Sequence, residues 1–132
     1  MKIVESPFIQ LHPDDIARPW LPVTLKNPHT GQAISVYGLI DTGADECAIP
    51  AQYALLIGHN LQAGTPKIID TGNGPTTAYA HTLSFETHGI KIENVLIDFM
   101  PNLSVVLFGV KSFLSNFILT INYPEKVFSL EK

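Results

Sequence analysis

The chain has 132 residues, of which 45% are hydrophobic and 15% are charged, a balance typical of one globular domain rather than a disordered segment. Its formal net charge is −4, and its eight Lys and Arg residues are scattered, which argues against nucleic acid as a partner. The single cysteine, Cys47, excludes an intramolecular disulfide and a metal site built from several cysteines, and no apolar run is long enough to span a membrane.

Residues 1–18 carry Pro7 and Pro13 and show no sustained hydrophobic period. We therefore expect an extended N-terminal arm ahead of one domain over residues 19–132. Glu5 and Pro7 also come too early for a signal peptide, and we expect a cytoplasmic protein.

Most of the following segments are rich in β-forming residues. Residues 20–26 and 33–40 flank a turn of sequence NPHTGQ and predict a hairpin. Residues 46–49 predict a short apolar strand. Pro50 suits the first turn of a helix over residues 51–57, which Gly58 would end.

The second half of the chain continues the same pattern. Residues 67–71 and 76–86 predict strands around Gly72-Asn73-Gly74-Pro75, a tight turn whose tip should be exposed and mobile. Two more strands are predicted over residues 90–99 and 105–108, then a short helix over 111–116 and a final hairpin over 117–130. The pattern predicts an all-β fold with one or two short helices.

The tripeptide Asp-Thr-Gly occurs twice, at residues 41–43 and 70–72. The first copy ends an apolar run, so a buried strand would carry Asp41 into a water-poor place. Two carboxyl groups that face each other there cannot both ionise, so they share one proton. The ionised group can then activate a water as a general base, while the protonated group polarises a carbonyl. Such a pair could combine Asp41 with Asp70, or Asp41 from two copies of the chain.

The segment GLIDTGADECAIP, residues 38–50, resembles the active-site segment of the retropepsin-like aspartic proteases. Three further features follow the order of that family. They are Arg18-Pro19 ahead of an apolar strand, the glycine turn at residues 72–74 where the family has the tip of its flap, and Leu107-Phe108-Gly109 ahead of a short helix. The longer C-terminal hairpin resembles cellular and bacterial members more closely than viral ones.

This resemblance implies a closed, barrel-like β fold with one lobe per chain, a flap hairpin, and a homodimer with the active site on its two-fold axis. It also implies hydrolysis of a polypeptide substrate without a metal, a cofactor or a covalent intermediate. Asp41 would be the catalytic carboxylate of each subunit, and Thr42 and Gly43 would brace the two active-site loops against each other. The substrate would be held by Gly43, Ala44 and Asp45 and, from the flap, by Gly72, Asn73 and Gly74.

A two-lobed enzyme of this kind would need the whole set of elements twice. Between Asp41 and Asp70 the sequence has no second apolar-apolar-Gly motif, and a turn follows Asp70 directly. We therefore interpret Asp70 as part of the first flap strand and predict a pair made of Asp41 from two chains.

Two other functions stay open. One is a non-catalytic module that keeps the fold for dimerisation or peptide binding. The intact Asp41-Thr42-Gly43-Ala44 favours the enzyme, because a scaffold has no need for a costly pair of like-charged carboxylates. The other is a protease with a weak dimer that is switched on by concentration or by a longer parent chain.

The sequence also departs from the family. Retroviral enzymes often have Arg after the apolar-apolar-Gly motif, where it anchors the Asp that corresponds to Asp45. Here Val110 and Lys111 follow, so we expect that network to be altered or absent, and Arg18 is a candidate partner for Asp45 of the other subunit. Cys47 is expected to be a buried, inert thiol. The five histidines show no metal-binding spacing and are interpreted as surface or turn residues: His12, His29, His59, His81 and His88.

Overall fold

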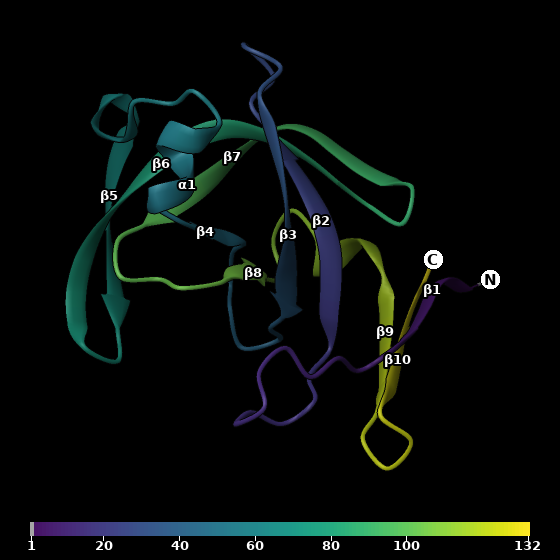
Figure 1. The fold of residues 1–132 in the computed structure, drawn as a ribbon. Coiled ribbons are helices and arrows are strands. Elements are labelled where there is room, and N and C mark those ends of the chain that lie inside the picture. Colours follow the sequence, from purple (N-terminus) through teal and green to yellow (C-terminus); the bar gives the residue numbers. More distant parts are fainter. Residues whose placement is uncertain (1) are drawn as a thin grey trace.

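The structure, a computed structural model, describes residues 2–132 and consists mostly of β-strands (Figure 1). The strands are β1 (Lys2–Pro7), β2 (Trp20–Lys26), β3 (Ala33–Ile40), β4 (Ala48–Pro50), β5 (Thr65–Thr71), β6 (Gly74–Thr87), β7 (Ile90–Met100), β8 (Val106–Phe108), β9 (Ile118–Asn122) and β10 (Val127–Glu131). The helical elements between them are α1 (Gln52–Leu56) and the short 3-10 helices η1 (Leu61–Ala63) and η2 (Leu114–Asn116). The predicted all-β fold is confirmed, although the helix expected over residues 111–116 is only the 3-10 helix η2. None of the helices in residues 2–132 has the length and apolar character needed to cross a membrane.

Six strands close into a barrel in the order β2-β3-β8-β4-β7-β6. Residues 24–26 of β2 pair with residues 84–86 of β6 and complete the ring. β5 pairs with β6 outside the ring, so the β5–β6 hairpin projects from the barrel, at the left of Figure 1. β1, β10 and β9 form a separate antiparallel sheet at the other side of the molecule.

The hairpin of β2 and β3 has the boundaries that the sequence predicts, and the two strands pair along their whole length. Leu21, Val23 and Leu25 are at most 3% exposed, whereas the residues between them face outward. This alternation is what a strand with one buried face requires. It places the end of β3, and the loop that follows, on the rim of the barrel.

An aromatic cluster fixes β8 in the core. The ring centroids of Phe108 and Phe113 lie 4.5 Å apart, and Phe85 of β6 is 5.7 Å from Phe108. All three side chains are at most 5% exposed. Because close-packed cores resist displacement, the segment directly after Phe108 is held in a fixed position.

The first residues differ from the predicted pattern. Residues 2–7 form β1, which pairs antiparallel with β10 and joins the C-terminal sheet. Val4 alone in this strand is buried, so no hydrophobic period marks it, and backbone hydrogen bonds to β10 define it. Residue 1 of the expected arm lies outside the described residues, and the division of the chain at residue 18 stays a prediction.

Two local predictions were wrong. Pro50 ends β4, opposite Met100 of β7, and does not open a helix. A proline, which has no N–H to donate, fits the end of an extended strand, and α1 begins only after it. His81, expected at the surface or in a turn, lies within β6 and is 8% exposed. Its ring stacks on His59 at a centroid distance of 4.5 Å, and each Nε2 is hydrogen-bonded to a backbone carbonyl.

Candidate active site

Asp41 is the first residue after β3, where that strand leaves the barrel wall. Its backbone N–H donates to the Phe108 carbonyl at 3.1 Å and continues the parallel pairing of β3 with β8. Its side-chain Oδ1 accepts a hydrogen bond from the Gly43 N–H at 3.0 Å, and its carbonyl accepts one from Ala44 at 3.2 Å. The carboxylate is half-buried in the single chain, with one oxygen oriented by its own loop.

The residues after β8 hold the far side of this loop. Val110 donates its N–H to the Ala44 carbonyl at 2.9 Å. A Cβ placed on Gly109 would lie 2.3 Å from the backbone oxygen of Glu46, closer than any two such atoms can approach. Glycine is therefore required at position 109, and the motif Leu107-Phe108-Gly109 serves to bring the chain against the loop of Asp41.

The remaining predicted residues of the loop have different exposures. Thr42, Gly43 and Asp45 are exposed in the single chain, and Ala44 is half-buried. The Thr42 side chain is exposed in the single chain and free to contact another molecule. Its bracing role would need a second chain and stays a prediction.

The glycine turn lies at the tip of the β5–β6 hairpin. Thr71 pairs with Gly74, so the turn consists of Gly72 and Asn73, both exposed as predicted. The Thr71 hydroxyl donates to the Gly74 carbonyl at 2.6 Å and accepts from the Asn73 N–H at 3.2 Å. Gly74 has φ of 98°, a conformation that favours glycine. The mobility of this tip stays a prediction.

The second Asp-Thr-Gly does not form a comparable loop. Asp70 lies within β5, opposite Pro75 of β6, and is exposed. Unlike Asp41, it does not follow a barrel strand and is not clamped by another segment. This position agrees with the interpretation of Asp70 as a residue of the projecting hairpin.

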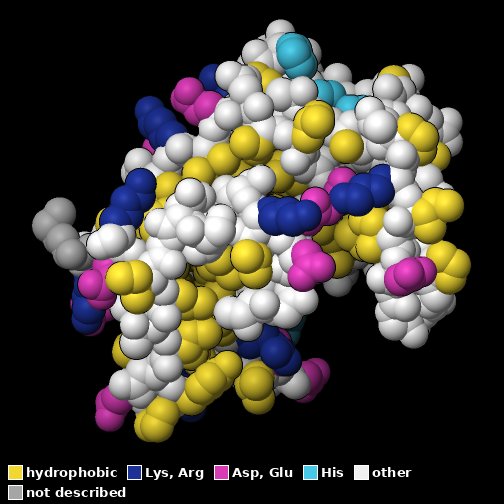
Figure 2. Space-filling view, turned by 180° about the vertical axis from the view of Figure 1, so that it is seen from behind, with side chains coloured by type: hydrophobic (Ala, Val, Ile, Leu, Met, Phe, Trp, Pro, Cys, Tyr) yellow, Lys and Arg dark blue, Asp and Glu magenta, His cyan; other side chains and the backbone are white. Residues whose placement is uncertain are grey.

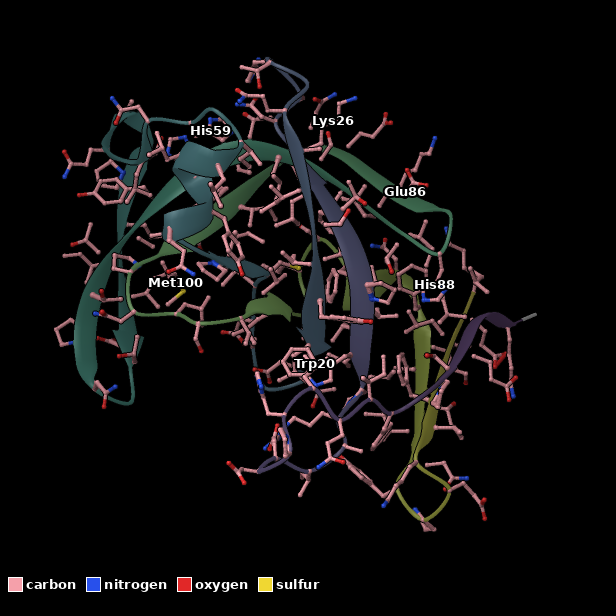
Figure 3. All side chains as sticks on the ribbon, in the orientation of Figure 1. Trp20, Lys26, His59, Glu86, His88 and Met100 are labelled. Atoms are coloured by element: carbon pink, nitrogen blue, oxygen red, sulfur yellow. The ribbon has the colours of Figure 1, made fainter. Side chains whose placement is uncertain are left out.

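A cavity of about 470 Å³ separates the Asp41 loop from β5. Its floor is made by residues 43–48 and Leu107, and its walls are made by residues 67–71 and by Asp98 and Met100 of β7. Figure 3 shows Met100 below the helix α1, between the barrel and the projecting hairpin. The cavity is therefore a groove beside the Asp41 loop, covered by the hairpin from one side.

Three charged side chains meet in this groove, and the sequence reasoning missed their association. Lys67 of β5 forms an ion pair with Glu46 of the active-site loop, and its Nζ lies 3.3 Å from Asp98 Oδ2. Lys111 Nζ is 3.6 Å from the other oxygen of Glu46. Figure 2 shows basic and acidic side chains side by side at the hollow where the hairpin meets the barrel.

The surroundings of the two carboxyl groups move their pKa values in opposite directions. The hydrogen bond from Lys67 holds the pKa of Glu46 below its usual value. Burial raises the pKa of Asp98, and the hydrogen bond that it shares with Glu46 raises it further. Asp98 is thus the member of the pair that keeps a proton more readily. The one sequence signal for it was a lone acidic residue inside the apolar strand of residues 95–100.

The departures from the family pattern have a structural outcome. Lys111 donates its N–H to the Asp45 carbonyl at 2.8 Å, and its side chain contacts Glu46 instead of the Asp45 carboxylate. Arg18 forms two hydrogen bonds of 2.8 Å with Asp15 of its own arm. In the single chain the guanidinium is therefore engaged, and its proposed contact with Asp45 of another subunit would have to replace this pair.

Cys47 is buried, as predicted, directly after the loop. Burial raises the pKa of its thiol to about 11, and its Sγ lies 3.4 Å from the Lys111 carbonyl. A thiol with this pKa is protonated at neutral pH and is a poor nucleophile. Among residues 2–132, no three His, Cys, Asp or Glu side chains are grouped so that they could hold a metal ion.

Comparisons with known proteins agree with this geometry. The model of a family described as aspartyl protease matches residues 22–112. A retropepsin-like aspartic protease from Rickettsia conorii has a similar structure, with a TM-score of 0.72 and 21% identity over 96% of this chain and 98% of that one. The EIAV protease, in complex with the inhibitor HBY-793, has a TM-score of 0.52 and 14% identity over 82% of this chain and 94% of that one. No curated protein matched the sequence.

The closed six-strand barrel has the single-lobe fold of the retropepsin-like aspartic protease to which it is similar. The chain belongs to the aspartyl protease family. Its fold has more in common with the bacterial enzyme than with the retroviral one, as its longer C-terminal hairpin indicated.

Proposed function

We propose that the protein is an endopeptidase that acts as a homodimer, with Asp41 of each chain forming the catalytic pair. The observation that carries this proposal is that, within residues 2–132, one Asp-Thr-Gly follows a barrel strand and is clamped from both sides, while the other lies in the projecting hairpin. One clamped loop supplies one carboxylate. A pair of carboxylates then needs a second copy of the chain, related by a two-fold axis through the loops.

The chemistry follows from two like charges held close together. The two Asp41 side chains share one proton, since both cannot ionise at short range. The ionised carboxylate takes a proton from a water, which attacks the peptide carbonyl, while the protonated carboxyl donates to the carbonyl oxygen. The tetrahedral intermediate then collapses as the leaving amine is protonated. The hydrogen bond from Gly43 to Asp41 Oδ1 keeps the carboxylate oriented throughout.

The β5–β6 hairpin is the flap in this proposal. β5 pairs with β6 along one edge, and an extended peptide in the groove would bind by strand addition between the flap and the active-site loop. Gly72, Asn73 and Gly74 at the tip would contact the peptide backbone from above, and Gly43, Ala44 and Asp45 would contact it from below. Thr42, which is exposed in the single chain, would then meet its symmetry mate at the two-fold axis.

The test compares Asp41→Asn with Asp70→Asn and wild type on a mixed peptide pool between pH 4 and 7. Asp41→Asn should abolish cleavage, because it removes both carboxylates of the pair, whereas Asp70→Asn should keep cleavage. Mixing equal amounts of wild type and Asp41→Asn should lower activity toward about one quarter, because wild-type pairs are then about one quarter of all dimers. Sedimentation of each protein checks that it is dimeric.

Three results would overturn the proposal in different ways. Loss of cleavage in both variants, with both still folded and dimeric, would indicate a pair assembled within one chain. An activity of one half, in a mixture whose subunits have been exchanged by unfolding and refolding the two proteins together, would show that each chain works alone. No cleavage by a folded, dimeric wild-type protein would favour the non-catalytic, peptide-binding alternative.

A further inference from the structure

The groove beside the catalytic loop contains charges that peptide-bond hydrolysis does not use. Asp98 lies near the end of β7, where it is paired to Ala80 on one side and to Ala48 on the other. Glu46 stands next to it, just before β4. Asp98 is therefore held by a barrel strand that pairs on both sides, whereas Glu46 lies in the loop that leads into β4.

Their counter-charge comes from a different part of the molecule. Lys67 lies on β5, the outer strand of the flap, and reaches across the groove to both carboxyl groups. The side chain of Asp98 is only 9% exposed, whereas that of Lys67 is 43% exposed. The Asp98 carboxyl group is thus fixed in the barrel wall beside Glu46, and the cation that both contact is carried by the hairpin, which would lift when a peptide enters.

Because Asp98 is buried, the presence or absence of the Lys67 ammonium beside it matters energetically. A carboxylate with so little access to water is costly unless it is protonated or paired with a cation. When the flap lifts, the ammonium of Lys67 leaves and the carboxyl pair faces the groove without it. The position of the Lys67 ammonium in the structure shows that a primary ammonium fits between Glu46 and Asp98.

We propose that Glu46 and Asp98 form a subsite for a lysine or arginine side chain of the substrate, and that Lys67 occupies this subsite in the free protein. The inference rests on the proposed function. The other charges of the groove favour a cation rather than an anion, since Asp45 and Asp70 also line the cavity and Lys67 is its only basic lining residue within residues 2–132. Gly43 of the Asp41 loop lines the same cavity as Glu46 and Asp98, so the basic side chain would belong to a residue a few positions from the bond that is cut. A two-fold axis would place one copy of the subsite on each side of that bond.

The experiment measures selectivity rather than activity. Peptides with an apolar pair at the cut carry Lys, Arg, Gln or norleucine at one position at a time on either side, and kcat/KM is measured for each. Norleucine matches the length and apolar stem of lysine without its charge. Wild type should cleave the Lys and Arg peptides about tenfold faster than the norleucine peptide at one position on each side, as expected for a charge-assisted hydrogen bond.

Four variants separate the subsite from general electrostatics. Glu46→Gln and Asp98→Asn should each reduce the preference for Lys to less than about threefold, because each removes one charged partner. Lys67→Met should increase it, since the internal competitor is gone. Asp70→Asn removes a negative charge from the same cavity but not from the Lys67 cluster, and it should leave the preference intact.

Each outcome decides the question. If norleucine is preferred at every position, or if Glu46→Gln and Asp98→Asn keep the wild-type preference for Lys, the subsite does not exist. If Asp70→Asn erases the preference for Lys as fully as Asp98→Asn does, the preference comes from the summed charge of the groove, and the proposed subsite is refuted. If wild type cleaves no peptide, the proposed function fails, and the same peptides with the central amide reduced to –CH2–NH– are tested by fluorescence anisotropy. Tighter binding of the Lys peptide to wild type than to Glu46→Gln then supports the subsite without catalysis, and equal binding refutes it.

Discussion

Substitution of Gly109 by alanine tests the close contact between the segment after β8 and the active-site loop. The added Cβ would lie 2.3 Å from the Glu46 carbonyl oxygen, 2.5 Å from its carbonyl carbon and 2.8 Å from the Ala44 oxygen. All three atoms belong to the backbone, so no side-chain rotation can relieve the overlap, and the loop or the strand must move. Overpacking of this kind costs about 1–3 kcal/mol, and we expect a value near the upper end, about 3 kcal/mol.

A loss of about 3 kcal/mol corresponds to a decrease in Tm of roughly 10 °C for a domain of this size. Gly72→Ala is the matched control for stability, because nothing lies within 4 Å of the position of its Cβ. It should change the free energy of unfolding by less than about 0.5 kcal/mol. The two variants and wild type are compared by urea and thermal unfolding at equal protomer concentration, since association would make stability depend on concentration.

The same substitution should act on catalysis more strongly than on folding. The loop that orients Asp41 is bonded directly to the residue after Gly109, through Val110 and Ala44. A shift of about 1 Å in that loop can cost on the order of a hundredfold in rate. If Gly109→Ala unfolded like Gly72→Ala and cleaved peptides at the wild-type rate, the clamp inferred for the active-site loop would be wrong.

Three further predictions concern other parts of the molecule. Gly38→Ala should destabilise the fold because its Cβ would lie 2.4 Å from the Phe108 ring; combining it with Phe108→Leu should cost less than the sum of the two single changes, as a double-mutant cycle in urea would show. Cys47 should resist iodoacetamide in the folded protein and react after unfolding, since burial raises its pKa to about 11; rapid modification at pH 7.5 without denaturant would contradict this. Burial lowers the pKa of His59 below its ordinary 6.5, so near this pH the unfolded chain binds a proton that the folded chain excludes. The contribution of His59 to stability is therefore complete above pH 6.5 and is lost as the pH falls below that value. His59→Gln should therefore flatten the loss of stability between pH 7 and pH 5 in urea titrations, and an unchanged slope would refute that assignment.

The sequence contained most of what positions the active site. Leu107-Phe108-Gly109 was identified through the family resemblance, because Gly109 meets Glu46, which is distant in the chain. The Asp-Thr-Gly loop and the glycine turn are local patterns, and each corresponds to a local geometry, a strand end and a two-residue turn. The β-forming residues on both sides of the NPHTGQ turn set the boundaries of β2 and β3 for the same reason. These features depend on neighbours in the chain, so one sequence is sufficient to find them.

The features that were missed depend on strand register instead. Lys67 lies 21 residues from Glu46 and 31 residues from Asp98, and the three meet only because β5, β6 and β7 pair in one particular alignment. The stacking of His59 on His81 has the same origin, since a loop is bonded onto the middle of β6. A shift of one residue in any of these strands would turn the side chains to the opposite face, and sequence patterns alone do not determine register that closely.

The outer edge of β5 has a consequence for the solubility of the protein. β5 is a seven-residue strand that pairs with β6 alone among the described strands, and its Ile68 is 76% exposed. An open, apolar sheet edge of this length is a template on which other chains can aggregate, yet it must stay open if a peptide is to add to it. Pro66 and Lys67 stand immediately before Ile68, and a residue without an N–H followed by a charge discourages pairing with another copy. Lys67, which lies between Glu46 and Asp98, is thus also placed to keep the outer edge of β5 from pairing with other chains. Replacing both Pro66 and Lys67 with valine should produce a protein that aggregates at concentrations where the wild type stays in solution.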